Sequence, residues 1–158
     1  MTARDATVIK RTVILLFLTL ASCLTAHAVR AEDSAPLTMV TPNKRYVTVA
    51  RGPGEAHSIG SYALRLYRNQ VASDPTQDFV AGVVQPRDGD LLRLDWENIT
   101  SNGPGNLIVI TQSVGSGGYL SADAFDLGRT TIVLVASVNG LPPDTDLIDA
   151  LKKAAAKK

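Results

Sequence analysis

Along most of the chain, apolar and polar residues alternate with a period of two, which is typical of β-strands with one buried face. The alternation begins at Tyr46 and is clear where Tyr62, Leu64 and Leu66 take every second position. Further predicted strands cover residues 79–84, 91–99, 107–111, 119–125 and 130–138. Clusters of glycine, proline and asparagine separate them at intervals of about 8–12 residues, so the pattern predicts an antiparallel, β-sandwich-like domain of the all-β class.

Three local features sharpen this prediction. Residues 79–84 are nearly all apolar, which indicates a buried strand. Pro86-Arg87-Asp88-Gly89 predicts a tight turn, because proline fixes the first φ and Asp-Gly tolerates tight geometry. Within residues 91–99, alternation predicts that Leu92, Leu94 and Trp96 share one face.

Residues 1–28 have the pattern of a signal peptide. Lys10 and Arg11 precede an apolar stretch over residues 12–20, and Ala26-His27-Ala28 is a small-residue cleavage site. The stretch is shorter than the about 20 residues of a membrane-spanning helix. We therefore expect export to the periplasm with cleavage after Ala28. Residues 20–23 also fit a lipobox, so an outer-membrane lipoprotein lipidated at Cys23 stays the alternative.

The rest of the chain divides into three predicted parts. Residues 29–44 are polar, contain proline and lack periodicity, which predicts a flexible N-terminal tether. Residues 45–141 form the predicted β domain. Residues 142–158 begin with two prolines that end the sheet and continue as a predicted short helix with a basic tail. Aspartates lie early and lysines late in this last segment, as the helix dipole favours.

Composition excludes several kinds of chemistry. The formal net charge is +1, with 16 Lys and Arg against 15 Asp and Glu, so we expect no binding of nucleic acid or of an anionic membrane surface. Cys23 is the single cysteine, and His27 lies in the predicted signal peptide, which leaves His57. A Cys–His dyad and a multi-histidine zinc site are then impossible in the exported domain. Since no Gly-x-Ser-x-Gly elbow accompanies His57, we interpret it as a solvated loop residue and expect no catalytic residue, metal or cofactor.

The segment between predicted strands 107–111 and 119–125 is distinguished by its glycines. Gly115, Gly117 and Gly118 fall within four positions, more than a simple hairpin needs, and each costs conformational entropy. Tyr119 ends the segment and is a residue type favoured at binding hot spots. From these residues alone, a wide hairpin turn and a narrow loop that enters a partner's cleft both stay open.

The segments on both sides of this loop resemble one known family. Residues 79–82, the predicted turn 86–89 and residues 111–125 are similar to the periplasmic inhibitors of invertebrate-type (I-type) lysozyme, within a resemblance over roughly residues 60–138. The most specific piece is a loop with a serine–glycine and a following tyrosine, matched by Ser116-Gly117-Gly118-Tyr119.

The resemblance implies an exported, all-β, non-enzymatic protein whose loop plugs the active-site cleft of a lysozyme. The partner-binding residues that it implies are Ser116, Gly117, Gly118 and Tyr119. Arg129, just after the following strand, is a further candidate for pairing with an acidic residue of the cleft. I-type lysozyme is the expected partner, and a homodimer is left open.

Two other functions stay open at this point. One is an envelope-binding or adhesion module that does not act on lysozyme. The other is a glycan hydrolase with paired carboxylates, for which Asp88, Asp95 and Asp123 are candidates. A turn near Asp95, Asn98 and Asn102-Gly103 also faintly resembles a calcium loop, although the closing glutamate of such a loop is missing.

Overall fold

The computed structural model describes residues 35–68, 78–100 and 103–157, all within one compact unit that spans Glu32–Lys158. The predicted signal peptide, with Cys23 and Ala28, lies outside the described residues. The described residues form eight strands and one helix. Their bounds are β1 Leu37–Val40, β2 Tyr46–Arg51, β3 Ile59–Tyr67, β4 Phe79–Asp88, β5 Asp90–Glu97, β6 Asn106–Gln112, β7 Leu120–Leu127, β8 Ile132–Leu141 and α3 Leu147–Ala155.

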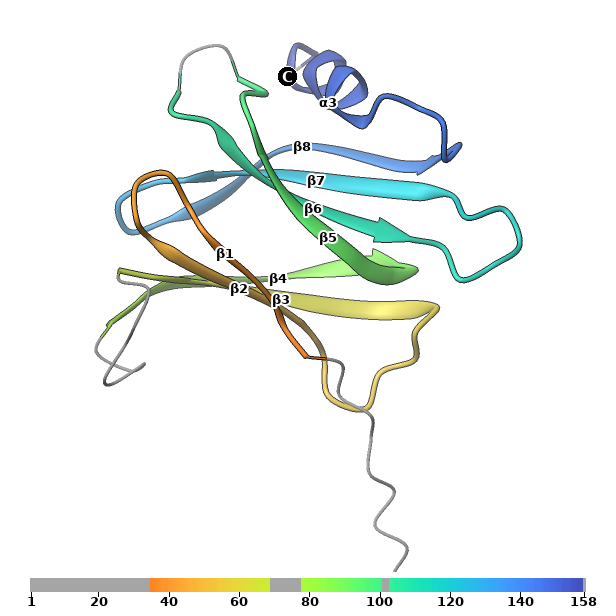
Figure 1. Cartoon of the computed structure of the whole chain (residues 1–158), viewed down its shortest axis with the longest axis horizontal. Coiled ribbons are helices and arrows are strands. Elements are labelled where there is room, and N and C mark those ends of the chain that lie inside the picture. Colours follow the sequence, from red (N-terminus) through yellow and green to blue (C-terminus); the bar gives the residue numbers. More distant parts are fainter. Residues whose placement is uncertain (1–34, 69–77, 101–102, 158) are drawn as a thin grey trace, which may run out of the picture. The chain divides into compact units, whose positions relative to one another are not determined.

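The strands form two four-stranded antiparallel sheets in which strand order follows chain order. The first sheet is β1-β2-β3-β4 and the second is β5-β6-β7-β8. Figure 1 shows the sheets stacked face to face, with α3 on the outer side of the second sheet. The predicted all-β sandwich with a short C-terminal helix is therefore confirmed.

The core between the sheets is built from alternate positions of their strands, as the period-two pattern predicts. Val47 and Leu64 from the first sheet and Val109 from the second are buried together. Tyr62 joins the two sheets, because its ring meets Phe125 edge to face at 6.5 Å and its hydroxyl donates to Asp123 Oδ2 at 2.6 Å. Burial and the Asp123 charge raise the pKa of Tyr62, so its hydroxyl stays a neutral donor.

Strand β6 is buried on both faces, because α3 covers the outer side of its sheet. Leu107 and Val109 belong to the core between the sheets, whereas Ile108 and Ile110 pack with Leu151 of the helix. Helix α3 begins after Asp146, whose carboxylate accepts hydrogen bonds from the N–H groups of residues 148 and 149 at 3.0 Å. Within the described part of the chain, helices lack the length and apolar character needed to cross a membrane.

Strand β1 lies within the segment that was predicted to be a tether. Leu37–Val40 pairs with β2, and Leu37 and Met39 pack against the core between the sheets. The strand was missed because it has four residues and prolines stand just before and after it. The β domain therefore starts before residue 45, whereas residues 29–34 lie outside the described residues.

The structure also corrects the expectations for residues 79–89. Strand β4 continues to Asp88 and pairs Pro86 with Ser61, and Gly89 alone connects it to β5 in the other sheet. Since β4 is an edge strand, it tolerates a proline, and Val84 is 67% exposed rather than buried.

In β5, the register shifts between Leu91 and Arg93, which marks a β-bulge or irregularity. Leu92 is exposed there, whereas Leu91, Leu94 and Trp96 pack against the core. The prediction that Leu92 shares a face with Leu94 and Trp96 is therefore wrong, because one extra residue reverses the alternation.

Candidate functional site

The connection between β6 and β7, residues 113–119, protrudes at one end of the second sheet (Figure 1). We call it the β6–β7 loop. The N–H of Ser113 donates to the carbonyl of Tyr119 at 2.8 Å, and the N–H of Gly118 donates to the carbonyl of Gly115 at 3.2 Å. The N–H of Gly115 donates to Ser113 Oγ at 3.3 Å. These bonds give the loop a defined shape although its tip is exposed.

Gly118 supplies the backbone conformation on which this shape depends. Its φ is +54°, in the left-handed region that side-chain-bearing residues rarely adopt. Its carbonyl accepts a hydrogen bond from Gln112 Nε2 at 3.3 Å. The last residue of β6 thus holds the loop just before the chain enters β7.

The predicted residues Ser116, Gly117, Gly118 and Tyr119 come together on this loop. Ser116 is exposed, and Tyr119 is 50% exposed. The Tyr119 ring lies against Gly117 so closely that a Cβ at residue 117 would overlap the ring. The loop therefore presents the Ser116 hydroxyl and the Tyr119 ring with its own hydroxyl, and the small size of Gly117 lets the ring lie where it does.

Val114 was not among the predicted site residues, yet it belongs to the same surface. Its side chain is 56% exposed at the start of the loop. A branched apolar residue among serines and glycines is the signal that could have identified it, because nothing in such a loop can bury it. Gln112 was also missed, since its contact with Gly118 depends on the loop conformation.

The base of the loop rests on the connection between the sheets. Gly89 has a φ of +96° and lies directly against the carbonyl of Gln112, so it has no room for a side chain. The Arg87 side chain is completely buried and donates from Nη1 to the carbonyl of Gly89. It also donates from Nε to the carbonyl of Ser61 at 3.1 Å. A buried guanidinium thus fixes the backbone beneath the loop.

Two carboxylates, Glu55 and Asp90, make contacts at the neighbouring connection between β2 and β3. Glu55 accepts hydrogen bonds from the N–H and hydroxyl of Ser61, which together with the Arg87 charge lower the pKa of Glu55. Asp90 Oδ2 lies 2.6 Å from His57 Nδ1. Burial alone would raise the pKa of Asp90, but the bonds from His57 and from the Leu91 N–H outweigh burial and lower it. Both carboxylates therefore stay ionised at neutral pH.

The structure does not bring Arg129 together with the β6–β7 loop. Arg129 lies on the turn between β7 and β8, at the opposite end of the eight-residue strand β7. At about 3.3 Å per residue, the two ends of β7 lie roughly 23 Å apart. The carbonyl of Arg129 accepts a hydrogen bond from Arg45 Nη2 at 3.4 Å, so this turn is tied to the first sheet.

The carboxylates considered for a glycan hydrolase do not converge. Asp123 lies between the sheets and is bonded to Tyr62, whereas Asp95 lies on the α3 side of its sheet and pairs with Arg93 at 2.9 Å. Paired carboxylates must flank one glycosidic bond, which residues on opposite faces of a sheet do not do. Asp88 is exposed at the end of β4.

No group of three or more His, Cys, Asp and Glu side chains in the described ranges could hold a metal ion. Of the residues that resemble a calcium loop, Asn102 lies outside the described residues, and Asp95 pairs with Arg93. The described residues therefore supply no metal centre to which a catalytic role could be assigned.

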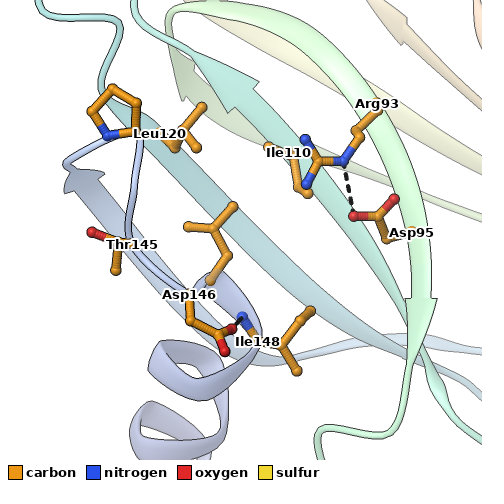
Figure 2. A pocket seen from close by; sticks show the side chains of 9 residues that line it. Arg93, Asp95, Ile110, Leu120, Thr145, Asp146 and Ile148 are labelled. Carbon is orange, nitrogen blue, oxygen red and sulfur yellow. Dashed lines mark hydrogen bonds and ion pairs between the residues drawn. The ribbon is translucent and has the colours of Figure 1, made fainter.

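A cavity of about 290 Å³ lies between β5, β6 and the start of α3 (Figure 2). Its apolar lining residues are Ile110, Leu120, Pro143, Leu147 and Ile148. Its charged lining residues already have partners, because Arg93 pairs with Asp95 and Asp146 caps the helix. The cavity thus lacks the convergent, unsatisfied polar groups that mark a ligand site.

Comparisons with known proteins find one family. A family model described as periplasmic lysozyme inhibitor of I-type lysozyme matches residues 32–155. The crystal structure of such an inhibitor from Aeromonas hydrophila is 39% identical, covers 75% of this chain and 99% of that chain, and has a TM-score of 0.67. A second structure holds the A. hydrophila inhibitor in complex with Meretrix lusoria lysozyme, with 39% identity, coverage of 75% and 96%, and a TM-score of 0.68. Curated protein sequences give no match.

The family match extends from before β1 to the last residue of α3, so it includes both sheets and the helix. The solved relatives are matched over nearly their whole length. This chain therefore belongs to the family of periplasmic lysozyme inhibitors of I-type lysozyme.

Proposed function

We propose that this protein inhibits an I-type lysozyme by inserting its β6–β7 loop into the active-site cleft of the enzyme. The observation that carries the proposal is a loop that is exposed at its tip and fixed at its base. Ser116 and Tyr119 are exposed, while the hydrogen bond between Ser113 and Tyr119 and the contact of Gln112 with Gly118 hold the loop's backbone. A related inhibitor forms a complex with Meretrix lusoria lysozyme, which supports a lysozyme as partner.

The chemistry of the loop fits a lysozyme cleft. Such a cleft carries carboxylates that act on the glycosidic bond of a bound sugar chain. The Ser116 hydroxyl donates a hydrogen bond to one of these carboxylates, which is a charge-assisted bond. The Tyr119 ring stacks where a sugar ring lies during catalysis, and its hydroxyl forms a hydrogen bond at the far end. The loop thereby occupies the place of the substrate.

The shape of the loop favours tight binding for two reasons. Glycines at residues 115, 117 and 118 keep it narrow enough to enter a cleft. Its internal hydrogen bonds form before the partner arrives, so little conformational entropy is lost on binding. The exposed Val114, at the start of the loop, adds apolar contact area beside Ser116 and Tyr119.

Inhibition assays with the purified mature protein test this proposal. We expect inhibition of an I-type lysozyme, with chicken-type and goose-type lysozymes as comparisons. Tyr119→Ala should raise the inhibition constant more than tenfold, because loss of a central anchor costs about 2 kcal/mol or more. Ser116→Ala should raise it less. Both variants should keep the melting temperature of the unmodified protein, since neither side chain is part of the core.

Ser137→Ala is the matched control, because Ser137 is also exposed but lies on β8. It should inhibit like the unmodified protein. If the double variant Ser116→Ala/Tyr119→Ala still inhibits the I-type lysozyme as the unmodified protein does, the loop does not plug the cleft. If no lysozyme class is inhibited at all, the proposed function is wrong, and a pull-down of envelope proteins tests the alternative of an envelope-binding module.

A further inference from the structure

His57 is an exposed side chain that the protein nevertheless holds in one place. The side chain is 59% exposed, and its Nδ1 lies 2.6 Å from Asp90 Oδ2. The backbone beside it is also fixed, because the carbonyls of Ala56 and His57 accept hydrogen bonds from Arg87 at 2.6 and 2.8 Å. An exposed side chain that serves only solubility needs no such restraint, and restraint of this kind is what a binding residue needs.

Asp90 and Arg87, which hold the His57 ring and backbone, are fixed by contacts of their own. The Arg87 side chain has no exposed surface and lies 3.6 Å from Glu55 Oε2. Asp90 Oδ1 accepts a hydrogen bond from the Leu91 N–H at 3.0 Å and lies 3.6 Å from Arg51 Nε. The lowered pKa of Asp90 means that this carboxylate is ionised and accepts hydrogen bonds at neutral pH. The support around His57 is therefore rigid on both its ring and its backbone side.

This support is shared with the β6–β7 loop. Asp90 is the strand partner of Gln112, the residue that precedes the loop and bonds to Gly118. Arg87 fixes Gly89, which lies against the carbonyl of Gln112. Figure 1 shows the connection from β2 to β3 and the β6–β7 loop at the same end of the two sheets. A partner that receives the loop therefore approaches the end of the molecule that carries His57.

We propose that His57 is a second contact residue for the I-type lysozyme and that Asp90 is its positioning residue, an inference that rests on the proposed function. A carboxylate only accepts hydrogen bonds, so His57 Nδ1 carries the hydrogen and Nε2 is the atom left to meet a partner. No other hydrogen bond to the ring occurs among the described residues. Nε2 bonds a polar side chain of the lysozyme beside the cleft that receives the loop.

Binding measured by calorimetry with the Meretrix lusoria lysozyme tests this inference. His57→Ala should raise Kd about fivefold to tenfold, as expected for a contact residue outside the central anchor. Asp90→Asn should raise Kd about threefold in the unmodified protein. In the His57→Ala background the same Asp90→Asn change should have no further effect, because its influence acts through the imidazole. Ser58→Ala, which changes the exposed neighbour of His57, should leave Kd unchanged.

The outcomes separate this inference from the proposed function. If His57→Ala binds as tightly as the unmodified protein while Tyr119→Ala binds weakly, the role of His57 is overturned and the loop mechanism stands. If Tyr119→Ala also binds as tightly, the loop mechanism itself fails. If Asp90→Asn weakens binding equally in both backgrounds, Asp90 supports the fold rather than the orientation of His57, and its positioning role is overturned.

Discussion

The two ends of strand β7 are used in different ways. At the end that begins with Leu120, the β6–β7 loop bonds mainly to itself and to Gln112, and leaves Tyr119 half exposed. At the end near Leu127, the turn to β8 is tied to the other sheet. Arg45 donates from Nη1 to the carbonyls of Leu127 at 3.2 Å and Gly128 at 2.7 Å. One end thus leaves side chains exposed, whereas the other end is bonded to Arg45, the residue just before β2 of the first sheet.

Under the proposed function, the difference teaches how one strand can serve binding at one end and stability at the other. Side chains at the loop tip are not part of the core, so substitutions there can alter partner binding while the fold stays intact. The turn at the other end uses mainly backbone carbonyls as acceptors, so its contact with Arg45 does not depend on which side chains the turn carries. The following four predictions test this division, beginning with the largest expected effect.

Gly117→Val should have the largest effect of the four changes and should weaken inhibition by the β6–β7 loop. A Cβ at this position would overlap the Tyr119 ring, so the ring must swing away from its present place. We expect the inhibition constant to rise more than tenfold, with an unchanged melting temperature because the displaced ring is exposed. A variant that inhibits normally would mean that the position of the Tyr119 ring is not required.

Arg45→Ala should destabilise the turn between β7 and β8 but leave inhibition by the β6–β7 loop unchanged. Loss of the hydrogen bonds from the partly buried guanidinium should lower the free energy of unfolding by about 1–2 kcal/mol. Urea denaturation measures this loss, and Arg45→Lys should retain part of the stability. Inhibition per folded molecule should be unchanged. A raised inhibition constant at full stability would contradict the division between the two ends.

Val114→Ser should weaken inhibition about threefold, since it removes exposed apolar area at the start of the β6–β7 loop but keeps the anchor residue Tyr119. Val133→Ser is its matched control, because Val133 has a similar exposed fraction but lies on β8. Inhibition constants of the two variants, measured side by side, decide the point. An equal effect at both positions would show that the loss is not specific to the β6–β7 loop.

Arg129→Ala should have the smallest effect, with less than a twofold change in the inhibition constant. The turn carries this side chain at the far end of β7 from the loop, and only its carbonyl takes part in the contact with Arg45. Steady-state inhibition assays give this ratio directly. A loss comparable to that of Tyr119→Ala would place a second part of the lysozyme at the turn end and would remove the distinction between the ends.

Much of the fold could be predicted, because apolar and polar residues alternate along a strand that has one buried face. Strands such as β2, β3 and β6 have one or both faces in the core, and their apolar positions show it. The edge strand β4 was predicted to be buried. Its apolar residues alone do not show whether a strand lies at the edge or in the middle of its sheet. The bulge in β5 was missed for a related reason, since one extra residue leaves an apolar side chain outside.

The candidate site could be predicted only in part. The glycine-rich loop with Ser116 and Tyr119 is local in sequence, so its residues were identifiable together. Arg87 gave no signal, because the carbonyls to which it donates on the β2–β3 side lie 26 to 31 residues away. Arg129 was chosen because it is near the loop in sequence, whereas a straight strand carries it to the far end. His57 was interpreted as solvated, since its contact with Asp90 spans 33 residues.

The family match confirms the resemblance that the sequence indicated. With it, the expectations of an inhibitor rather than an enzyme, and of a periplasmic protein, are confirmed. The cleavage after Ala28, lipidation at Cys23 and a homodimer stay predictions. Mass spectrometry of the mature N-terminus distinguishes the first two.

The agreement between strand order and chain order bears on how the protein folds after export. All described pairings join strands that follow one another along the chain, so each sheet grows by adding successive hairpins with short loops to close. Contacts between the sheets, such as the bond from Tyr62 to Asp123 across 61 residues, are the distant ones. Since β1 to β4 precede β5 to β8 along the chain, the first sheet can form before the second is complete. The hairpin of β6 and β7, which carries the β6–β7 loop, can then fold onto a sheet that is already formed.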